Sequence, residues 1–178
     1  DKTNEEKATR FANHLATVFT PLTTTTSNDP NTNIHEQFPK PLLPTTTTFR
    51  TREVKSLINK LKCNKSPGYD LITAKALKEL PNIGHTYLTQ LFNAITRLRY
   101  FPAHWKIAEI IMIPKPGKPP DTVSSYRPIS LLPIVGKLYE KLLLAKLEPV
   151  ILERNLIPDH QFGFRSQHST LEQVHRVH

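Results

Sequence analysis

The sequence predicts an α+β fold that is mostly helical and contains one small β-hairpin. Apolar residues recur at helical spacing in several segments, which is the pattern of helices that bury one face. One short run rich in isoleucine has the β-branched composition of a strand. A Pro/Gly-rich connection joins this run to a second extended stretch, so the two stretches are expected to pair as a hairpin.

The first segment, residues 1–20, is predicted to form an amphipathic helix. Thr3 and Glu6 have the spacing of a capping box, in which each side chain satisfies a free backbone N–H at the helix start. Pro21 is expected to stop the helix because proline cannot continue the hydrogen-bond pattern. Residues 21–48 hold two threonine tracts and several prolines. We expect a flexible linker there, because few apolar groups can offset the entropy of ordering the backbone.

Further helices are predicted near residues 51–61, 73–80 and 82–98. Thr51 is the expected N-cap of the first of them. Its buried face is expected to consist of Val54, Leu57, Ile58 and Leu61. The inward positions of the helix over 82–98 are expected to be Ile83, Tyr87, Leu91, Phe92, Ile95 and Leu98.

The hairpin is predicted in the second half of the chain. Residues 107–113 form a nearly continuous apolar run, as in a strand that is buried on both faces. The prolines of residues 114–120 cannot donate to a strand ladder, so this segment is a loop, and 129–132 is the next extended stretch. A helix is expected over 134–148, ended or kinked by Pro149. Its expected inward residues are Val135, Leu138, Leu142 and Ala145.

The composition favours a polyanionic partner. The formal net charge is +9, from 24 Lys and Arg against 15 Asp and Glu, and such an excess is typical of nucleic-acid binding. The alternative is a solvated basic surface. Cys63 is the only cysteine, which excludes an internal disulfide. No apolar run approaches the ~20 residues that a membrane-spanning helix needs.

Cations are concentrated around the predicted hairpin. Between residues 97 and 127 only Glu109 and Asp121 oppose Arg97, Arg99, Lys106, Lys115, Lys118 and Arg127. A hairpin folded at its loop would bring Lys115 and Arg127 near each other. A compact ammonium beside a two-pronged guanidinium suits a triphosphate, although a solvated basic hairpin is an equally good interpretation of the spacing alone.

Glycine-containing loops beside a cation occur at Lys65-Ser66-Pro67-Gly68 and at Gln161–Arg165. Glycine allows close approach of the backbone to a ligand, and free N–H groups can bind phosphate oxygens, but each loop alone is more often an ordinary turn. The aspartates form no close pair in the sequence, and no histidine or cysteine motif with metal-ligand spacing is present. The sequence therefore predicts no metal site.

Several motifs in series carry a family resemblance. They are LKCNKSPGYDLI at 61–72, WKIAEIIMIPKPGK at 105–118, SYRPISLL at 125–132, KLYEKL at 137–142, and QFGFR at 161–165 followed by His168-Ser169-Thr170. In this order they resemble the reverse transcriptases of jockey-like (LINE-type) non-LTR retrotransposons. The resemblance covers about Thr51 to the end. The helix over residues 1–20 is similar, less specifically, to the connector that follows the endonuclease of that family.

The resemblance implies part of an RNA-directed DNA polymerase with a right-hand architecture, namely the fingers and the start of the palm. It implies that Lys115 and Arg127 contact the incoming deoxynucleoside triphosphate. The residues implied to lie near the RNA template or the DNA primer are Lys65, Ser66, Gly68, Lys118, Gln161, Gly163 and Arg165. The family's metal-binding aspartates are expected beyond residue 178, so Mg²⁺ is expected for the complete enzyme, and none is expected in this chain.

The expected organisation is a connector helix over 1–20, a linker over 21–48, and the N-terminal part of a reverse transcriptase domain over 49–178. The expected partners include the rest of a retrotransposon polyprotein, with an upstream endonuclease and a downstream palm and thumb. The chain alone is expected to be inactive in polymerisation. The alternatives are a non-catalytic RNA-binding module and a non-functional relic. An intracellular setting is expected, with nucleus and cytoplasm both open.

Overall fold

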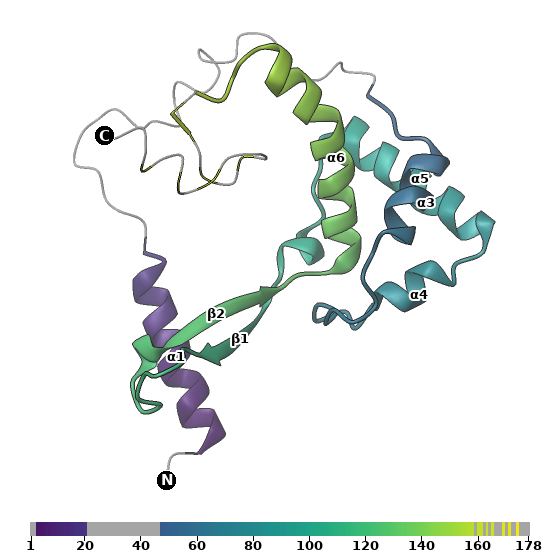
Figure 1. Cartoon of the computed structure of the whole chain (residues 1–178). Coiled ribbons are helices and arrows are strands. Elements are labelled where there is room, and N and C mark those ends of the chain that lie inside the picture. Colours follow the sequence, from purple (N-terminus) through teal and green to yellow (C-terminus); the bar gives the residue numbers. More distant parts are fainter. Residues whose placement is uncertain are drawn as a thin grey trace. The chain divides into compact units, whose positions relative to one another are not determined.

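The computed structural model describes residues 3–20 and 47–158, with isolated positions between His160 and Val174. The described residues form two compact units, each assembled from segments that are separated in the sequence. The elements of the first unit are α1 (Asn4–Val18), α4 (Ala74–Lys78), η1 (Ala103–Lys106), β1 (Glu109–Pro114), η2 (Val123–Ser125) and β2 (Tyr126–Leu131). The second unit contains α3 (Thr51–Asn59) and α5 (Asn82–Leu98), while α6 (Ile134–Glu153) starts in the first unit and continues in the second (Figure 1).

The predicted α+β class is confirmed, since helices predominate and the described strands form one antiparallel pair. The predicted capping box at the start of α1 is also present: the Glu6 N–H donates to Thr3 Oγ1 at 3.3 Å, and the Thr3 N–H donates to Glu6 Oε2 at 3.0 Å. Residues 21–46 of the predicted linker lie outside the described residues. None of the helices in the described ranges is long and apolar enough to cross a membrane.

The core of the second unit joins α3, α5 and α6. Ile58 of α3 and Phe92 of α5 are fully buried, and the Tyr139 ring of α6 lies against Phe92 with 5.5 Å between centroids. The Tyr139 hydroxyl is 3.1 Å from Thr96 Oγ1, which gives this buried polar group a partner. Lys146 of α6 donates to Glu53 of α3 at 2.7 Å. Residues far apart in the sequence therefore hold the unit together.

The predicted start of α3 is off by one residue, and the predicted inner face of α5 is wrong in part. Helix α3 begins at Thr51, so Arg50 is its N-cap. In α5, Phe92 and Ile95 are buried as expected, but the other buried residues are His85 and Thr89. The exposed residues of the predicted set are Ile83, Tyr87, Leu91 and Leu98. Apolar residues occupy a wide arc of this helix. Helix α5 contacts α3, and only the part of the arc that contains Phe92 and Ile95 is buried.

Helix α6 differs from the prediction at its C-terminal end. Val135, Leu138 and Leu142 are buried as predicted, whereas Ala145 is exposed. The helix continues through Pro149 to Glu153, so the proline does not end it. A proline removes one hydrogen bond and crowds the carbonyl four residues earlier, and this cost is tolerated here within the last turns of a long helix.

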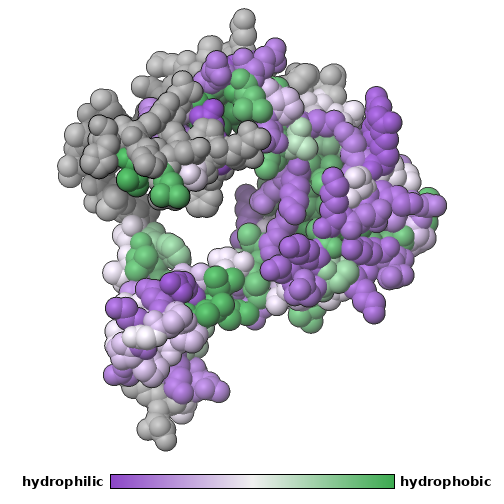
Figure 2. All heavy atoms as spheres, in the orientation of Figure 1, coloured by the Kyte–Doolittle hydropathy of each residue, from purple (hydrophilic) through white to green (hydrophobic). Residues whose placement is uncertain are grey.

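The hairpin itself is confirmed, but the prediction that its first strand is buried on both faces is wrong. Only Met112 of β1 is half-buried, and the other residues of the strand are exposed. The described sheet has two strands, so no further strand shields their apolar residues. The isoleucine content predicted the strand correctly because β-branched residues favour extended backbone, independently of what covers it. Figure 2 shows hydrophobic residues exposed over the hairpin.

Gly68 anchors the loop of residues 61–72 to the junction between β2 and α6. The glycine is buried, and a Cβ built on it would lie 2.6 Å from the backbone nitrogen of Pro133 and 2.7 Å from the carbonyl carbon of Leu132. Both neighbours are backbone atoms, which cannot rotate away as a side chain can. Close approach of two backbone segments therefore requires glycine at this position.

Replacing Gly68 with alanine is expected to destabilise the protein by about 1–3 kcal/mol, the usual cost of forcing an added methyl group into a closely packed site. Urea unfolding compares Gly68→Ala with Ser66→Ala, which changes an exposed side chain of the same loop. We expect the second variant to stay within about 0.5 kcal/mol of the unsubstituted protein. Equal stability of the two variants would show that the loop is not anchored through Gly68.

Candidate functional site

The tip of the hairpin is closed by a tight turn over Lys115–Lys118. The Lys118 N–H donates to the Lys115 carbonyl at 3.3 Å, and Gly117 has a φ of 70°. Proline at the second position and a left-handed glycine at the third are the sequence signature of a type II turn. The Lys118 side chain is exposed beside this turn.

The strand register places the two predicted nucleotide-binding cations on one face of the hairpin. Ile113 pairs with Arg127, so these side chains project from the same face. The Lys115 N–H donates to the Ser125 carbonyl at 2.7 Å, which extends the ladder past Pro114. Lys115 lies directly after the strand, and continuing the strand alternation by this one residue puts it on the face of Arg127.

The two cations differ in how they are held. The Lys115 side chain is half-buried, and its Nζ donates to the Ser124 carbonyl at 2.7 Å, so the ammonium is fixed at the tip. An ammonium has three donors, which leaves capacity for an anionic ligand. Arg127 is exposed, and within the described ranges its guanidinium makes no hydrogen bond or ion pair. The Lys115 ammonium thus has a partner within the chain, whereas the Arg127 guanidinium has none among the described residues.

Apolar side chains continue this face along the strands. Ile111 pairs with Ile129, and both share the face of Ile113 and Arg127. The exposed fractions are 43% for Ile111, 46% for Ile113 and 41% for Ile129, so the apolar part is open to solvent. A face with cations at one end and isoleucines along its length suits a ligand that combines an anionic group with a flat apolar ring.

The loop that Gly68 anchors presents its preceding polar residues to solvent. Lys65 and Ser66 are exposed, whereas Gly68 is buried against the chain's own backbone. Direct contact between Gly68 and a ligand is therefore not supported, and its observed contribution is to hold the loop. Leu71 is 75% exposed with a φ of 57°, a conformation that is unusual for a bulky residue. Such strain is found more often at functional sites, and no residue pattern in the sequence predicted it.

The second predicted glycine loop belongs to the second unit. The Gln161 N–H donates to the Pro158 carbonyl at 3.0 Å, and Gln161 Nε2 donates to the Gly163 carbonyl at 3.2 Å. Arg165 is half-buried and donates to the Pro158 carbonyl at 3.4 Å. Phe162 and Phe164 of this loop lie outside the described residues, as do His168, His175 and His178.

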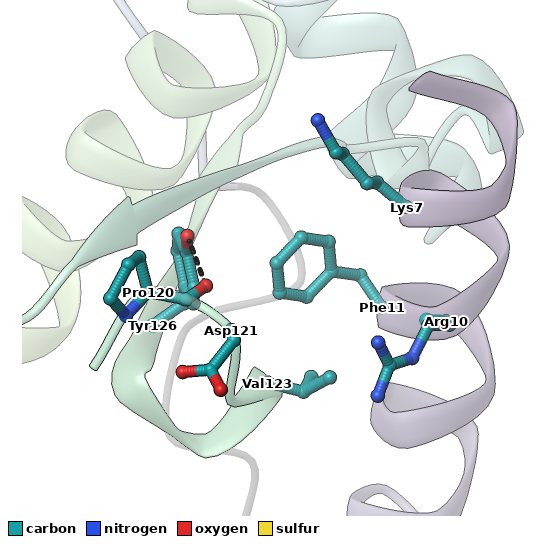
Figure 3. Close-up of a pocket in the computed structure, with 7 residues that line it drawn as sticks. All are labelled: Lys7, Arg10, Phe11, Pro120, Asp121, Val123 and Tyr126. Atoms are coloured by element: carbon teal, nitrogen blue, oxygen red, sulfur yellow. Dashed lines mark hydrogen bonds between the residues drawn. The ribbon is translucent and has the colours of Figure 1, made fainter. Parts of the chain in front are cut away.

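A pocket between α1 and the hairpin tip was not predicted. Its volume is about 540 Å³, and its lining consists of Lys7, Arg10, Phe11, Pro120, Asp121, Val123 and Tyr126 (Figure 3). Phe11 points from α1 toward Tyr126, with 4.9 Å between ring centroids and 71° between ring planes. Phe11 is one of the apolar residues of the predicted amphipathic helix, but no local signal in the sequence identifies its partner in β2.

The described residues offer no fit for a divalent metal. Among them, no group of three or more His, Cys, Asp or Glu side chains is arranged to hold an ion. Asp121 lines the pocket beside Lys7 and Arg10, and it lacks a second carboxylate there. Two-metal phosphoryl transfer requires convergent carboxylates, and the described residues do not present such a group.

Comparisons with known proteins extend over nearly the whole chain. Residues 113–178 match the family described as reverse transcriptase (RNA-dependent DNA polymerase). Over 99% of its length, the chain is 44% identical to the probable RNA-directed DNA polymerase from transposon BS of Drosophila melanogaster. It is 42% identical, again over 99% of its length, to the RNA-directed DNA polymerase from mobile element jockey of Drosophila funebris.

A more distant relative is the retrovirus-related Pol polyprotein from type-1 retrotransposable element R1 of Bradysia coprophila, which is 30% identical over 66% of the chain. The matched region is a small part of each relative. The chain spans 20% of the transposon BS protein, 19% of the jockey protein and 12% of the R1 polyprotein.

Proposed function

This chain is a homologue of the RNA-directed DNA polymerases of jockey-like non-LTR retrotransposons, and we propose that it forms the fingers side of such a polymerase. In this role it binds the RNA template and the incoming deoxynucleoside triphosphate. The observation that carries the proposal is the common face of Lys115 and Arg127 on an exposed hairpin.

The triphosphate assignment rests on charge and geometry. A guanidinium donates two parallel hydrogen bonds to phosphate oxygens, and an ammonium acts as a compact charge beside it. The bond from the Lys115 ammonium to the Ser124 carbonyl favours one side-chain geometry, which lowers the loss of side-chain freedom on binding. The isoleucines of the same face, Ile111, Ile113 and Ile129, offer an apolar surface for the base.

Template and primer contacts are proposed for residues of the three loops. These residues are the exposed Lys65, Ser66, Lys118, Gln161 and Gly163 and the half-buried Arg165. Their cations would contact phosphates, which gives affinity without sequence preference. Gly68 is proposed only to position the first loop, because it is buried against Leu132 and Pro133.

The proposed organisation keeps residues 1–20 as a connector and 49–178 as the N-terminal part of a right-hand polymerase domain. The family implies a divalent metal for the complete enzyme, but the described residues provide no site for it. We propose that metal binding and the chemical step belong to other parts of a longer polyprotein. One relative is itself named as a Pol polyprotein, which supports such a context.

Arg127→Ala is expected to impair nucleotide use more than template binding, when assayed in a polymerase that contains this chain together with the catalytic segment. Loss of a charge-assisted two-pronged contact costs about 1.5–3 kcal/mol, or roughly a tenfold to hundredfold loss of kcat/KM for nucleotide. Arg97→Ala removes an exposed arginine of α5 and serves as the matched control. Unchanged nucleotide kinetics in both variants would refute the triphosphate assignment.

Binding of single-stranded RNA is expected to weaken steeply with salt, because phosphate contacts release counterions. The log–log slope is about −0.7 for each neutralised phosphate, so about four contacts give a slope near −3. Replacing both Lys115 and Arg127 with glutamate should remove about two phosphate contacts and make the slope correspondingly less steep. Lys141 and Arg154 are exposed cations of the second unit, and their double reversal is the control.

A fluorescence titration at several salt concentrations measures these slopes. Equal flattening by both double reversals would exclude the hairpin as the principal contact surface. Strong RNA binding through the hairpin, combined with no effect of Arg127→Ala on nucleotide use, would favour the alternative of a non-catalytic RNA-binding module.

A further inference from the structure

Helix α1 contacts the hairpin at its tip and at η2. The contact centres on Phe11, which is half-buried and points at the Tyr126 ring (Figure 3). The pocket of about 540 Å³ lies beside this ring pair and is lined by both rings. The pair joins α1 to the first residue of β2. Edge-to-face pairs of this kind are worth more than their buried area alone.

Tyr126 is held from two directions. Its ring meets Phe11 in an edge-on arrangement, and its hydroxyl donates to the Pro120 carbonyl at 2.9 Å. Tyr126 is also the first residue of β2, paired with Pro114 and directly followed by Arg127. Fixing Tyr126 on one face of the strand therefore fixes the backbone from which Arg127 projects on the other face.

Lys115, which follows β1, is attached to η2, the element directly before Tyr126. Its backbone N–H donates to the Ser125 carbonyl at 2.7 Å, and its Nζ donates to the Ser124 carbonyl at 2.7 Å. Both acceptors belong to η2, which α1 contacts. The two cations of the proposed nucleotide site are therefore both connected to the segment Val123–Tyr126 on which α1 rests.

The hairpin needs such support because two strands alone are only marginally stable in water. The side chains of β1 and β2 are largely exposed, so little packing holds the tip in one geometry. We propose that Phe11 of α1 is a positioning residue, which holds the hairpin tip so that Lys115 and Arg127 present their cations in one arrangement. This proposal rests on the proposed function for the role of the cations, but the physical link between α1 and the tip is independent of it.

Hydrogen exchange of the Lys115 amide in this chain tests the physical link. Phe11→Ala should speed this exchange about threefold to tenfold, because removal of the ring pair makes opening of the tip easier. Phe19→Ala is the matched control, since Phe19 is an aromatic residue at the end of the same helix and is 66% exposed. Phe11→Tyr retains the ring and should leave exchange near the original rate. Unchanged exchange in Phe11→Ala, or equal acceleration in Phe19→Ala, overturns the proposal.

Nucleotide kinetics in a polymerase that contains this chain test the positioning role. If Lys115 and Arg127 adopt the binding arrangement in a smaller fraction of the molecules, the apparent affinity for nucleotide falls in proportion to that fraction. Phe11→Ala should raise the nucleotide KM about threefold to tenfold, and Phe11→Tyr should restore it. If Phe11→Ala speeds exchange of the Lys115 amide but leaves the nucleotide KM unchanged, while Arg127→Ala does impair nucleotide use, then Phe11 does not position the two cations. If Arg127→Ala has no effect, the proposed function fails, whereas the exchange measurement still decides whether α1 holds the tip.

Discussion

The antiparallel ladder between β1 and β2 determines where each side chain of the hairpin points. Pairing of Ile113 with Arg127, extended by the hydrogen bond from Lys115 to Ser125, places a lysine, an arginine and several isoleucines on one face. A shift of the register by one residue would move Arg127 to the opposite face. The face on which Arg127 lies depends on this register, and the turn at Gly117 and η2 connect the strands at the tip.

The register in turn is supported from outside the strands. At the tip, Phe11 packs against Tyr126. At the other end of the hairpin, the chain leaves β2 through Leu132 and Pro133, where Gly68 packs against the backbone without room for a side chain. Elements distant in sequence thus support both ends of a sheet that is too small to be stable alone. Apart from the half-buried Met112, Tyr126 and Leu131, the residues of both strands are exposed within the described part of the chain, so they are accessible to a ligand.

The sequence predicted those features that local patterns determine. The bounds of α5 follow from an apolar periodicity that begins after Pro81, and the hairpin follows from prolines and a glycine between two extended stretches. The capping box of Thr3 and Glu6 is equally local. The family resemblance was also visible in the sequence, because its motifs are short and occur in a fixed order.

Features that depend on distant residues were not predictable. Ile83 and Phe92 are both apolar, and only the contacts of α5 with α3 and Tyr139 decide that Phe92 is the buried one. The exposure of β1 likewise depends on what packs against it. Gly68 matched a ligand-binding loop by its composition, whereas its burial against Pro133 depends on a segment far along the chain. The pairing of Phe11 with Tyr126 has no local signal at all.

The most direct test of the central claim is a nuclear magnetic resonance titration of this chain with a deoxynucleoside triphosphate and with the matching deoxynucleoside. If Lys115 and Arg127 bind the triphosphate, their amide signals should shift with the triphosphate much more than with the deoxynucleoside. The amide of Lys141, an exposed lysine of the second unit, should be unaffected by both. Shifts elsewhere in the chain with none at Lys115 and Arg127 would contradict the account.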